Sequence, residues 1–376
     1  MLFRSVGWYR RAFKLPKEDE GKRIWLTFDG VFRDATVWVN GWCVRHHEGG
    51  YYPFREDITD VVHYGGKNTV SVRVDATKVE GWFYEGAGIY RHVWLDKTAP
   101  VAIAPDGIYV CSKLQNGITE VDVEAQIQNK RIHQTNDDYN VYVNFEIVAP
   151  NGKSLGEISR RVGQPVVRDV LELKACSQQQ VRSFFIFFPT NAVIRMPLST
   201  PHDETKEVFS PAELWSPENP KLYRLITTVT IGEKSQAAQN CFLDRQETTF
   251  GIRTVGFDAT NGFLLNGKHY ELYGTCNHQD HAGVGAAIPD ALQEFRVRRL
   301  KEFGCNAYRT SHHPPTPELL DACDRLGMLV MDESRLMGSD SENIRKWDDQ
   351  IRRDRNHPSV AIWCIANEQL DRKSVV

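Results

Sequence analysis

The pattern of apolar residues changes near residue 256, and this change limits the chain to an architecture of several domains. Before it, apolar and polar side chains alternate with a period of two, as in residues 69–74, which is typical of half-buried strands. After it, short apolar runs alternate with segments of helical spacing. The chain has 376 residues, 41% of them hydrophobic and 25% charged, which is enough apolar material for two or three globular domains.

Residues 1–97 are predicted to form an antiparallel β-sandwich. Residues 36–39 are rich in β-branched and aromatic side chains, and Asn40-Gly41 directly after them is a strong hairpin signal. Residues 98–255 continue the strand pattern, and we expect them to form a second sandwich, of immunoglobulin type.

Residues 256–376 are predicted to form the first half of a (β/α)8 barrel, with four parallel strands and three helices. The strands are expected at residues 270–274, 306–309, 328–331 and 360–366. The last of them is continuously apolar, which is typical of a strand buried on both faces. A doubly wound sheet has the same alternation, but no glycine-rich phosphate loop follows the first strand.

The helices between these strands differ in how clearly they are marked. The second has Thr316 as an N-cap, Pro317 at its first position and Gly327 at its end. The first and third are expected to bury faces made of Leu292, Phe295, Leu300 and Phe303, and of Ile344, Trp347 and Ile351.

Each of the four predicted barrel strands ends in amide or ionisable residues. They form the segments Asn277-His278-Gln279-Asp280-His281, Arg309-Thr310-Ser311-His312-His313, Asp332-Glu333 and Asn367-Glu368. Because parallel barrel strands end at one mouth, we expect these side chains to share a pocket. Any one of them has a structural alternative, such as an ion pair of Asp332 or Glu333 with an arginine. Their common position on four strands favours a functional site.

Glu368 is the best candidate for an acid that protonates a departing glycosidic oxygen. Hydrolysis of a glycosidic bond needs such an acid and a second carboxylate that is a nucleophile or a base. Glu368 follows an apolar strand, where partial burial would raise its pKa toward the useful range. The amide of Asn367 is placed to hold a sugar hydroxyl.

A zinc site is the alternative for the histidine-rich strand ends. Imidazoles and a carboxylate suit zinc, and the candidate ligands are His278, Asp280, His281, His312 and His313. However, no H-E-x-x-H spacing occurs, and sites that bind hydroxyl groups need the same donors. We therefore expect neither a metal nor another cofactor.

Charge and composition exclude some partners. A net charge of −3 argues against nucleic acid, and no apolar run approaches the roughly 20 residues that span a bilayer. The N-terminal residues lack a signal-peptide pattern, which does not separate a periplasmic or secreted protein from a cytoplasmic one. The eight cysteines have no paired or zinc-like spacing and are expected to be isolated, largely buried thiols.

Motifs throughout the chain resemble glycoside hydrolase family 2. Its acid/base signature is similar to Arg355-Asn356-His357-Pro358-Ser359-Val360, Trp363 and Asn367-Glu368. Its jelly-roll domain is similar to Gly7-Trp8-Tyr9-Arg10-Arg11, Val39-Asn40-Gly41 and Gly86-Ala87-Gly88-Ile89-Tyr90-Arg91. Its immunoglobulin-like domain is similar to Leu214-Trp215-Ser216-Pro217-Glu218-Asn219-Pro220 and Phe250-Gly251-Ile252-Arg253. The resemblance implies a retaining glycosidase with a jelly-roll first domain.

The resemblance also implies roles for single residues. By this resemblance Glu368 matches the general acid/base, and Asn367 contacts the sugar next to the scissile bond. His278 and His312 match residues that bind glycone hydroxyls. Asp280 and Arg309 match residues that support the pocket, and Glu333 belongs to a motif at the third strand. The Glu-x-His that binds magnesium in some relatives is missing after Glu333. The family's nucleophile, a glutamate on the seventh barrel strand, is expected past residue 376, and more jelly-roll sequence is expected before residue 7. The chain is therefore expected to be truncated at both ends and inactive alone.

Two segments resemble the β-galactosidase branch of that family. They are residues 278–285 and 80–86. We therefore expect a β-galactoside as substrate and leave open whether the full-length protein is a homo-oligomer. The alternatives are a β-glucuronidase of the same family and a non-catalytic carbohydrate-binding or structural remnant.

Overall fold

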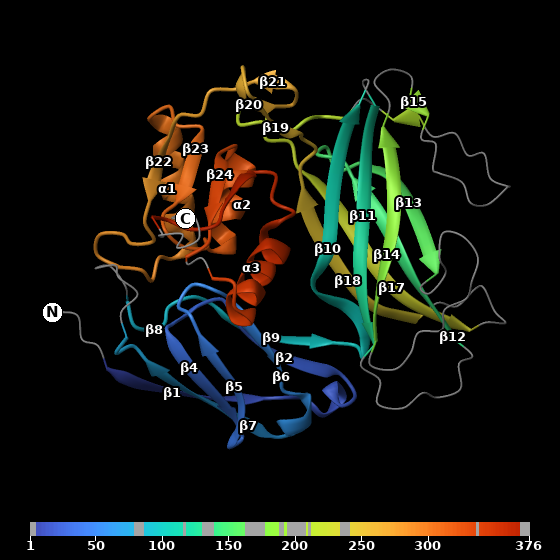
Figure 1. Cartoon of the computed structure of the whole chain (residues 1–376). Helices are drawn as coiled ribbons and strands as arrows, with labels where there is room; N and C mark the ends of the chain where they lie inside the picture. Colours follow the sequence, from blue (N-terminus) through green and yellow to red (C-terminus); the bar gives the residue numbers. More distant parts are fainter. Residues whose placement is uncertain are drawn as a thin grey trace.

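The computed structural model describes most of the chain as three parts (Figure 1). The described residues are 5–78, 86–115, 118–129, 139–161, 177–187, 192–193, 208–209, 212–233, 241–335 and 338–368. Two β-sandwiches precede a four-stranded parallel sheet with three helices. The architecture is that expected: a jelly-roll-type sandwich, an immunoglobulin-like sandwich and part of a TIM barrel. No helix in the described part of the chain is long and apolar enough to cross a membrane.

The first sandwich packs one four-stranded sheet against one three-stranded sheet, around a core that includes Ile24, Val37 and Val72. The four-stranded sheet has the order β1 (Val6–Lys14), β7 (Lys67–Asp75), β4 (Asp34–Val39), β5 (Trp42–Glu48). The three-stranded sheet has the order β6 (Phe54–Asp57), β2 (Arg23–Phe28), β9 (Val93–Thr98), and a short pair joins β3 (Val31–Phe32) to β8 (Gly88–Ile89). The predicted hairpin is confirmed: Asn40 and Gly41 have φ of 51° and 90° between β4 and β5.

The second sandwich is built from longer strands around a core that includes Ile127, Phe145 and Val229. One sheet has the order β10 (Val101–Gln115), β11 (Ile118–Asn129), β14 (Ser177–Phe187). The other has the order β13 (Ser154–Arg161), β12 (Tyr139–Val148), β17 (Tyr223–Glu233), β18 (Cys241–Phe250). A two-stranded piece pairs β15 (Ala192–Val193) with β16 (Val208–Phe209).

The third part begins with a small antiparallel sheet and continues as a parallel one. The small sheet contains β19 (Val255–Asp258), β20 (Gly262–Leu265) and β21 (Lys268–His269). The parallel sheet has the order β22 (Gly274–Asn277), β23 (Ala307–Thr310), β24 (Leu329–Glu333), β25 (Val360–Cys364). The helices between its strands are α1 (Asp290–Glu302), α2 (Pro317–Leu326) and α3 (Ser341–Asp354). The first parallel strand begins four residues later than predicted, at Gly274 in place of Tyr270.

The second helix follows its sequence signals closely. The Thr316 hydroxyl accepts from the backbone N–H of Leu319, and Pro317 occupies the first turn. Gly327 ends the helix with a φ of 74°, a left-handed conformation that favours glycine. A Cβ on Gly327 would come within 2.3 Å of the Pro217 carbonyl oxygen, so this end of α2 also packs directly on the second sandwich.

The faces predicted for the other two helices are only partly correct, since Leu292, Leu300 and Trp347 are half-buried, with Leu300 packed on the core, while the other predicted residues are exposed. In α1 the buried residues are Gln293 and Val297. Phe295 is exposed, and the Arg299 guanidinium lies over its ring, with Cζ 5.1 Å from the ring centroid. In α3 the buried residues are Gln350 and Asp354, because this helix docks through polar contacts. Its apolar residues Ile344 and Ile351 are exposed, at 54% and 44%.

Two further expectations about burial also fail. β25 is an edge strand of the sheet, with Trp363 exposed, because within the described residues it pairs only with β24. Of the seven described cysteines only Cys323 is buried, and Cys43, Cys241 and Cys276 are exposed. All seven are free thiols, as expected, and position 176 lies outside the described residues.

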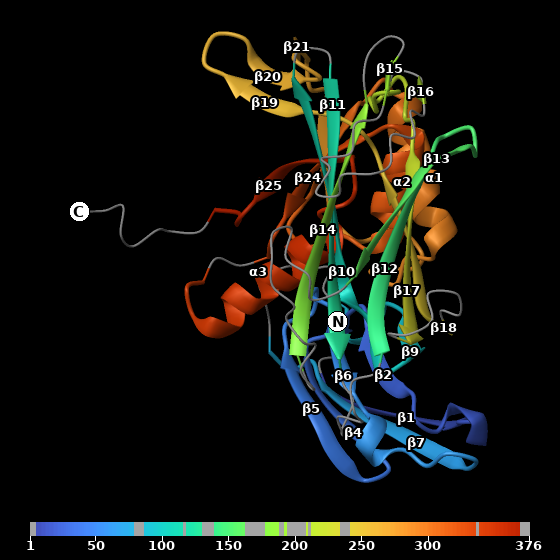
Figure 2. The same cartoon turned by 90° about the vertical axis from the view of Figure 1, so that its right-hand side faces the viewer.

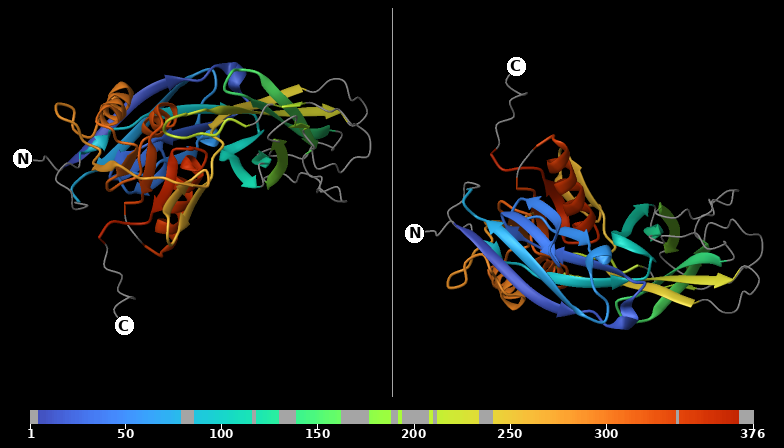
Figure 3. Two further views of the ribbon diagram at one scale, coloured as in Figure 1. Left: turned by 90° about the horizontal axis from the view of Figure 1, so that it is seen from above. Right: turned by 90° about the horizontal axis from the view of Figure 1, so that it is seen from below.

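The barrel part contacts both sandwiches (Figures 1 and 2). The Trp215 indole of the second sandwich is fully buried and donates to the Asp324 carbonyl oxygen on α2, at 3.0 Å. Asn356, after α3, accepts from Val110 N–H and donates to the Ile108 carbonyl oxygen, both at 2.9 Å. Figure 3 shows that the first sandwich and the barrel part lie together, while the strands of the second sandwich extend to one side.

Candidate active site

Arg309, on β23, contacts side chains of the other three barrel strands or of the segments after them. Its side chain starts on β23, and its Nε donates to Oε2 of Glu333, at the end of β24, over 2.6 Å. Its Nη2 donates to Oδ1 of Asn367, in the segment after β25, over 2.8 Å. Its Nη1 also lies 3.8 Å from the thiol sulfur of Cys276 on β22. The guanidinium therefore reaches side chains from all three of the other parallel strands or their following segments.

Glu333 is held on both of its carboxylate oxygens. Its side chain is fully buried; while Oε2 accepts from Arg309, Oε1 lies 2.7 Å from Nδ1 of His312. Burial opposes the charge on Arg309, but the Glu333 carboxylate outweighs it and raises the pKa of the guanidinium. Both carboxylate oxygens of Glu333 are therefore engaged, by Arg309 and by His312.

The two histidines predicted to share the pocket do lie together. The rings of His278 and His312 meet edge to face, with centroids 5.3 Å apart. Arg296 on α1 donates to the backbone carbonyl oxygen of His278 over 2.6 Å, which supports the segment after β22. Burial and the neighbouring His312 ring lower the pKa of His278. The His278 imidazole is therefore neutral at neutral pH and can both donate and accept a hydrogen bond.

Glu368 lies in a bend after β25, next to Asn367. It has a φ of 49°, an uncommon conformation for a residue other than glycine, and its side chain is exposed. The partial burial expected for this acid is absent here because β25 is at the edge of the sheet. Asn367, directly before Glu368, is held in place by its contact with Arg309.

Two of the remaining strand-end residues lie apart from this cluster. His313 is fully buried, stacks on Tyr51 of the first sandwich and has its Nδ1 3.0 Å from the Pro314 carbonyl oxygen. Asp332 is also fully buried and accepts from Gln350 on α3, at 2.8 Å. Burial and the nearby Asp354 raise the pKa of Asp332 well above its usual range. Both residues serve packing behind the strand ends.

Asp280 is half-buried two residues past His278, and its charge opposes the lowering of the His278 pKa. Sequence reasoning missed the contributions of Arg296 and Cys276. Nothing in the sequence around Arg296 separates it from the other cations of α1. Cys276 precedes Asn277 on β22, a position from which strand alternation places a side chain on the same face as Arg309's partners.

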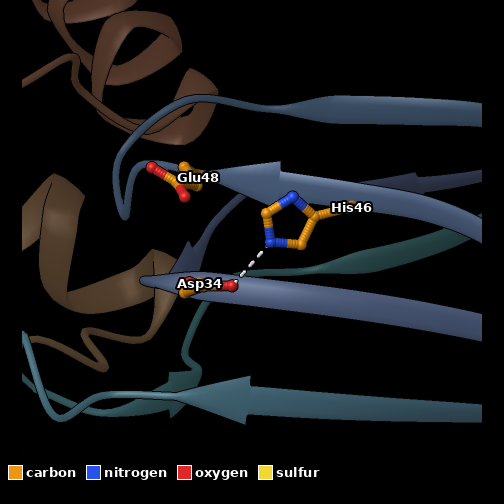
Figure 4. A group of neighbouring side chains, drawn as sticks. All are labelled: Asp34, His46 and Glu48. Carbon is orange, nitrogen blue, oxygen red and sulfur yellow. Dashed lines mark hydrogen bonds and ion pairs between the residues drawn. The ribbon is translucent and has the colours of Figure 1, made fainter.

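Histidines and carboxylates that could share a metal ion occur elsewhere. Within the described ranges, three groups have ligand atoms no more than 4.8 Å apart, and these are Asp34 with His46 and Glu48, His92 with Asp290 and Glu318, and Asp321 with Asp324 and His357. Figure 4 shows the first group, in which His46 on β5 contacts Asp34 on β4 at 2.8 Å. None of these groups contains a strand-end histidine, so the zinc alternative gains no geometric support from the described residues.

Comparison with family models covers nearly the whole chain. Residues 3–100 match the sugar binding domain of glycosyl hydrolases family 2. Residues 103–253 match a second model, described simply as glycosyl hydrolases family 2. Residues 259–348 and 339–375 match its TIM barrel domain. The chain belongs to glycosyl hydrolases family 2.

This family 2 chain is similar to relatives with two different activities in their names. It is 33% identical to the beta-galactosidase BoGH2A of Bacteroides ovatus, over 98% of the chain and 40% of that relative. It is 29% identical to a beta-glucuronidase of Bacteroides fragilis, over 97% of the chain and 50% of that relative. The chain thus spans half or less of the length of these relatives.

Solved structures show the same coverage. The structure of a glycosyl hydrolase family 2 member from Bacteroides cellulosilyticus superimposes with a TM-score of 0.82 at 32% identity, over 99% of this chain and 46% of that one. A beta-glucuronidase structure from Bacteroides uniformis superimposes with a TM-score of 0.78 at 27% identity, over 97% of this chain and 41% of that one.

Proposed function

We propose that the whole protein to which this family 2 chain belongs is a retaining glycosidase that cleaves terminal β-galactosides, with Glu368 as the general acid/base. The observation that carries the proposal is the network in which Arg309 connects Glu333, His312 and Asn367. This network places the residue before Glu368 among the same strand ends that carry the two histidines.

In this mechanism Glu368 first gives its proton to the glycosidic oxygen as the bond to the aglycone breaks. It then takes a proton from the water that releases the sugar. Its exposure leaves room for both the leaving group and the water. A retaining reaction also needs a nucleophilic carboxylate about 5 Å from the acid. Asp332 and Glu333 are buried and engaged, so we place the nucleophile outside residues 1–376.

The sugar is recognised by imidazole and amide groups in this proposal. His278 and the Nε2 of His312 form hydrogen bonds with the glycone hydroxyls, since Nδ1 of His312 is engaged by Glu333, and the amide NH2 of Asn367 donates to the hydroxyl next to the scissile bond. Asn367 uses its amide oxygen for Arg309, so the NH2 group is the part turned to the ligand. Asp280 and Arg309 support these residues from behind.

The choice of a galactoside over a glucuronide rests on charge and on the segment 278–285. A glucuronide carries a carboxylate that calls for a cation, but Arg309 in the described cluster is already paired with Glu333. The other segment that resembles the β-galactosidase branch, 80–86, falls almost wholly outside the described residues. Beta-glucuronidase remains the second candidate because relatives with that name are 27–29% identical over nearly all of the chain.

The test is hydrolysis of matched aryl β-galactosides and aryl β-glucuronides by the complete protein. We expect a kcat/KM for the galactoside at least tenfold above that for the glucuronide, and loss of both activities in Glu368→Ala. The reverse preference assigns the protein to the second candidate. No hydrolysis of either, with retained binding of the monosaccharides, indicates a carbohydrate-binding protein.

A further inference from the structure

Three side chains of the first sandwich cross to the barrel part and contact it just beyond its strand ends. They are Tyr51, Tyr52 and Arg91. In Figure 1 this sandwich (blue) lies directly below the barrel strands (orange to red). The contacts fall in the segments after β22, β23 and β24, which are the segments that carry or follow His278, His312 and Glu333.

Arg91 connects two of these segments to each other. Its Nη2 donates to the side-chain oxygen of Gln279 at 3.0 Å and to the carbonyl oxygen of Pro314 at 2.8 Å. Gln279 directly follows His278 and is buried, and Pro314 lies two positions after His312. The guanidinium therefore sets the distance between the backbones that carry the two histidines.

The other end of the Arg91 fork is fixed in the first sandwich. Its Nη1 donates to the carbonyl oxygen of Tyr51 at 2.9 Å. The neighbouring Tyr90 hydroxyl donates to the Gly50 carbonyl oxygen at 2.8 Å and lies 3.4 Å from the same Gln279 oxygen. The acceptors of Arg91 are carbonyl and amide oxygens from separate segments, and a planar guanidinium holds such a set in a fixed geometry.

Tyr51 and Tyr52 hold the second and third segments. The fully buried ring of Tyr51 stacks on His313 with centroids 5.9 Å apart. The Tyr52 hydroxyl lies 2.7 Å from the Ser334 hydroxyl and accepts from the backbone N–H of Arg335 at 3.1 Å. Ser334 directly follows Glu333, so the carboxylate that orients Arg309 and His312 is supported from the first sandwich as well.

We infer that Arg91, Tyr51 and Tyr52 are positioning residues, and that the first sandwich sets the spacing of the histidines that bind the glycone. They touch no ligand themselves and act through the segments that carry His278 and His312. The inference rests on the proposed function only for its effect on catalysis. The effect on the geometry of the two histidines is independent of what the protein hydrolyses.

The experiment compares Arg91→Met with His92→Gln in the complete protein. His92 is a matched control because it is the next residue and joins the same two parts, by a contact of 3.0 Å to Asp290 on α1 that reaches no strand end. Arg91→Met is expected to lower kcat/KM on the order of 10²-fold, as a displacement of binding groups by about 1 Å does. The inhibition constant of the free monosaccharide is expected to rise in parallel, while His92→Gln changes both less than twofold.

A second variant separates positioning from general loss of structure. Gln279→Met removes the same contact from the other side, so the double variant with Arg91→Met should be little worse than either single one. Histidine-selective ¹⁵N spectra should show altered ring signals of His278 and His312 in Arg91→Met and unaltered ones in His92→Gln. The complete protein and its variants are compared at a temperature where their circular dichroism spectra agree.

The outcomes distinguish the two proposals. Absence of hydrolysis by the unsubstituted protein overturns the proposed function, while the ring signals still decide the positioning inference. Full activity with unchanged ring signals in Arg91→Met overturns the positioning inference alone. Losses of Arg91→Met and Gln279→Met that simply multiply in the double variant also overturn it, because the two residues would then act through different contacts.

Discussion

Replacement of Glu333 by glutamine tests whether this buried carboxylate compensates Arg309. The Glu333 side chain is fully buried, and the side chains of its partners Arg309 and His312 are only 28% and 12% exposed. Glutamine keeps the shape and one acceptor oxygen but removes the charge. Loss of one partner of a buried ion pair costs about 3–5 kcal/mol, and since Arg309 keeps some contact with water we expect the lower end, about 3 kcal/mol.

The assay is hydrogen exchange of the complete protein, followed in peptides from β23 and β24. A loss of about 3 kcal/mol accelerates exchange through local opening about 10²-fold. The matched control is Glu302→Gln, which removes a carboxylate from the exposed ion pair with Arg299 and should change exchange of α1 by less than tenfold.

Addition of Arg309→Met to Glu333→Gln supplies the decisive comparison. If the carboxylate compensates the guanidinium, the methionine removes the uncompensated charge, and the double variant loses clearly less than the two single losses added together. Strictly additive losses would refute the reasoning, because they would mean that the two groups do not depend on each other. Glu333→Gln and the double variant should both lose activity, because Arg309 then no longer holds the Asn367 side chain in position.

Three further predictions follow from the described geometry. Glu368→Gln in the complete protein should abolish hydrolysis of substrates with poor leaving groups and slow activated aryl glycosides much less in the glycosylation step; equal losses would argue against an acid. Burial lowers the pKa of His357, but the Asp324 carboxylate at 2.6 Å outweighs this effect of burial and raises the pKa to about 9. The stability that this pair contributes is therefore fully present below about pH 6.5 and is lost as the pH rises through about 9. Melting temperatures of His357→Gln should therefore lack that decline, and an unchanged pH profile would contradict it. Residues 1–376 expressed alone should not hydrolyse an aryl β-galactoside, because Asp332 and Glu333 are buried and engaged; activity that disappears in Glu368→Ala would require a second carboxylate within the chain.

The fold could be predicted from the sequence wherever local signals decide the structure. Thr316, Pro317 and Gly327 bound their helix because capping depends on the side chains and backbone of those residues themselves. Asn40-Gly41 predicts its hairpin for the same reason. The buried face of α1 could be predicted only in part, because Leu300 packs on the core and Phe295 does not. Phe295 is apolar, but its exposure depends on the angle at which the helix meets the sheet, which no local signal contains.

The candidate site, too, could be predicted only where local signals or topology decide the arrangement. That polar residues at four strand ends gather follows from parallel topology, and the proximity of His278 to His312 agrees with it. The role of Glu333 could not be derived, because a carboxylate at a strand end faces a ligand or a partner depending on side chains from other strands. Here the partners are Arg309 and His312, which together engage both oxygens.

The contacts of the first sandwich were the least accessible to sequence reasoning, although Arg91 lies in a segment that resembles a family motif. Arg91 is separated from Gln279 by 188 positions, and Tyr52 from Ser334 by 282. Loop-closure entropy rises only slowly with such separations, so distant segments can be joined when their domains already pack together. Packing of the domains is therefore the condition for these contacts, and the contacts in turn fix the strand-end segments. A variant that loosens this interface should affect glycone binding before it affects the fold of either sandwich.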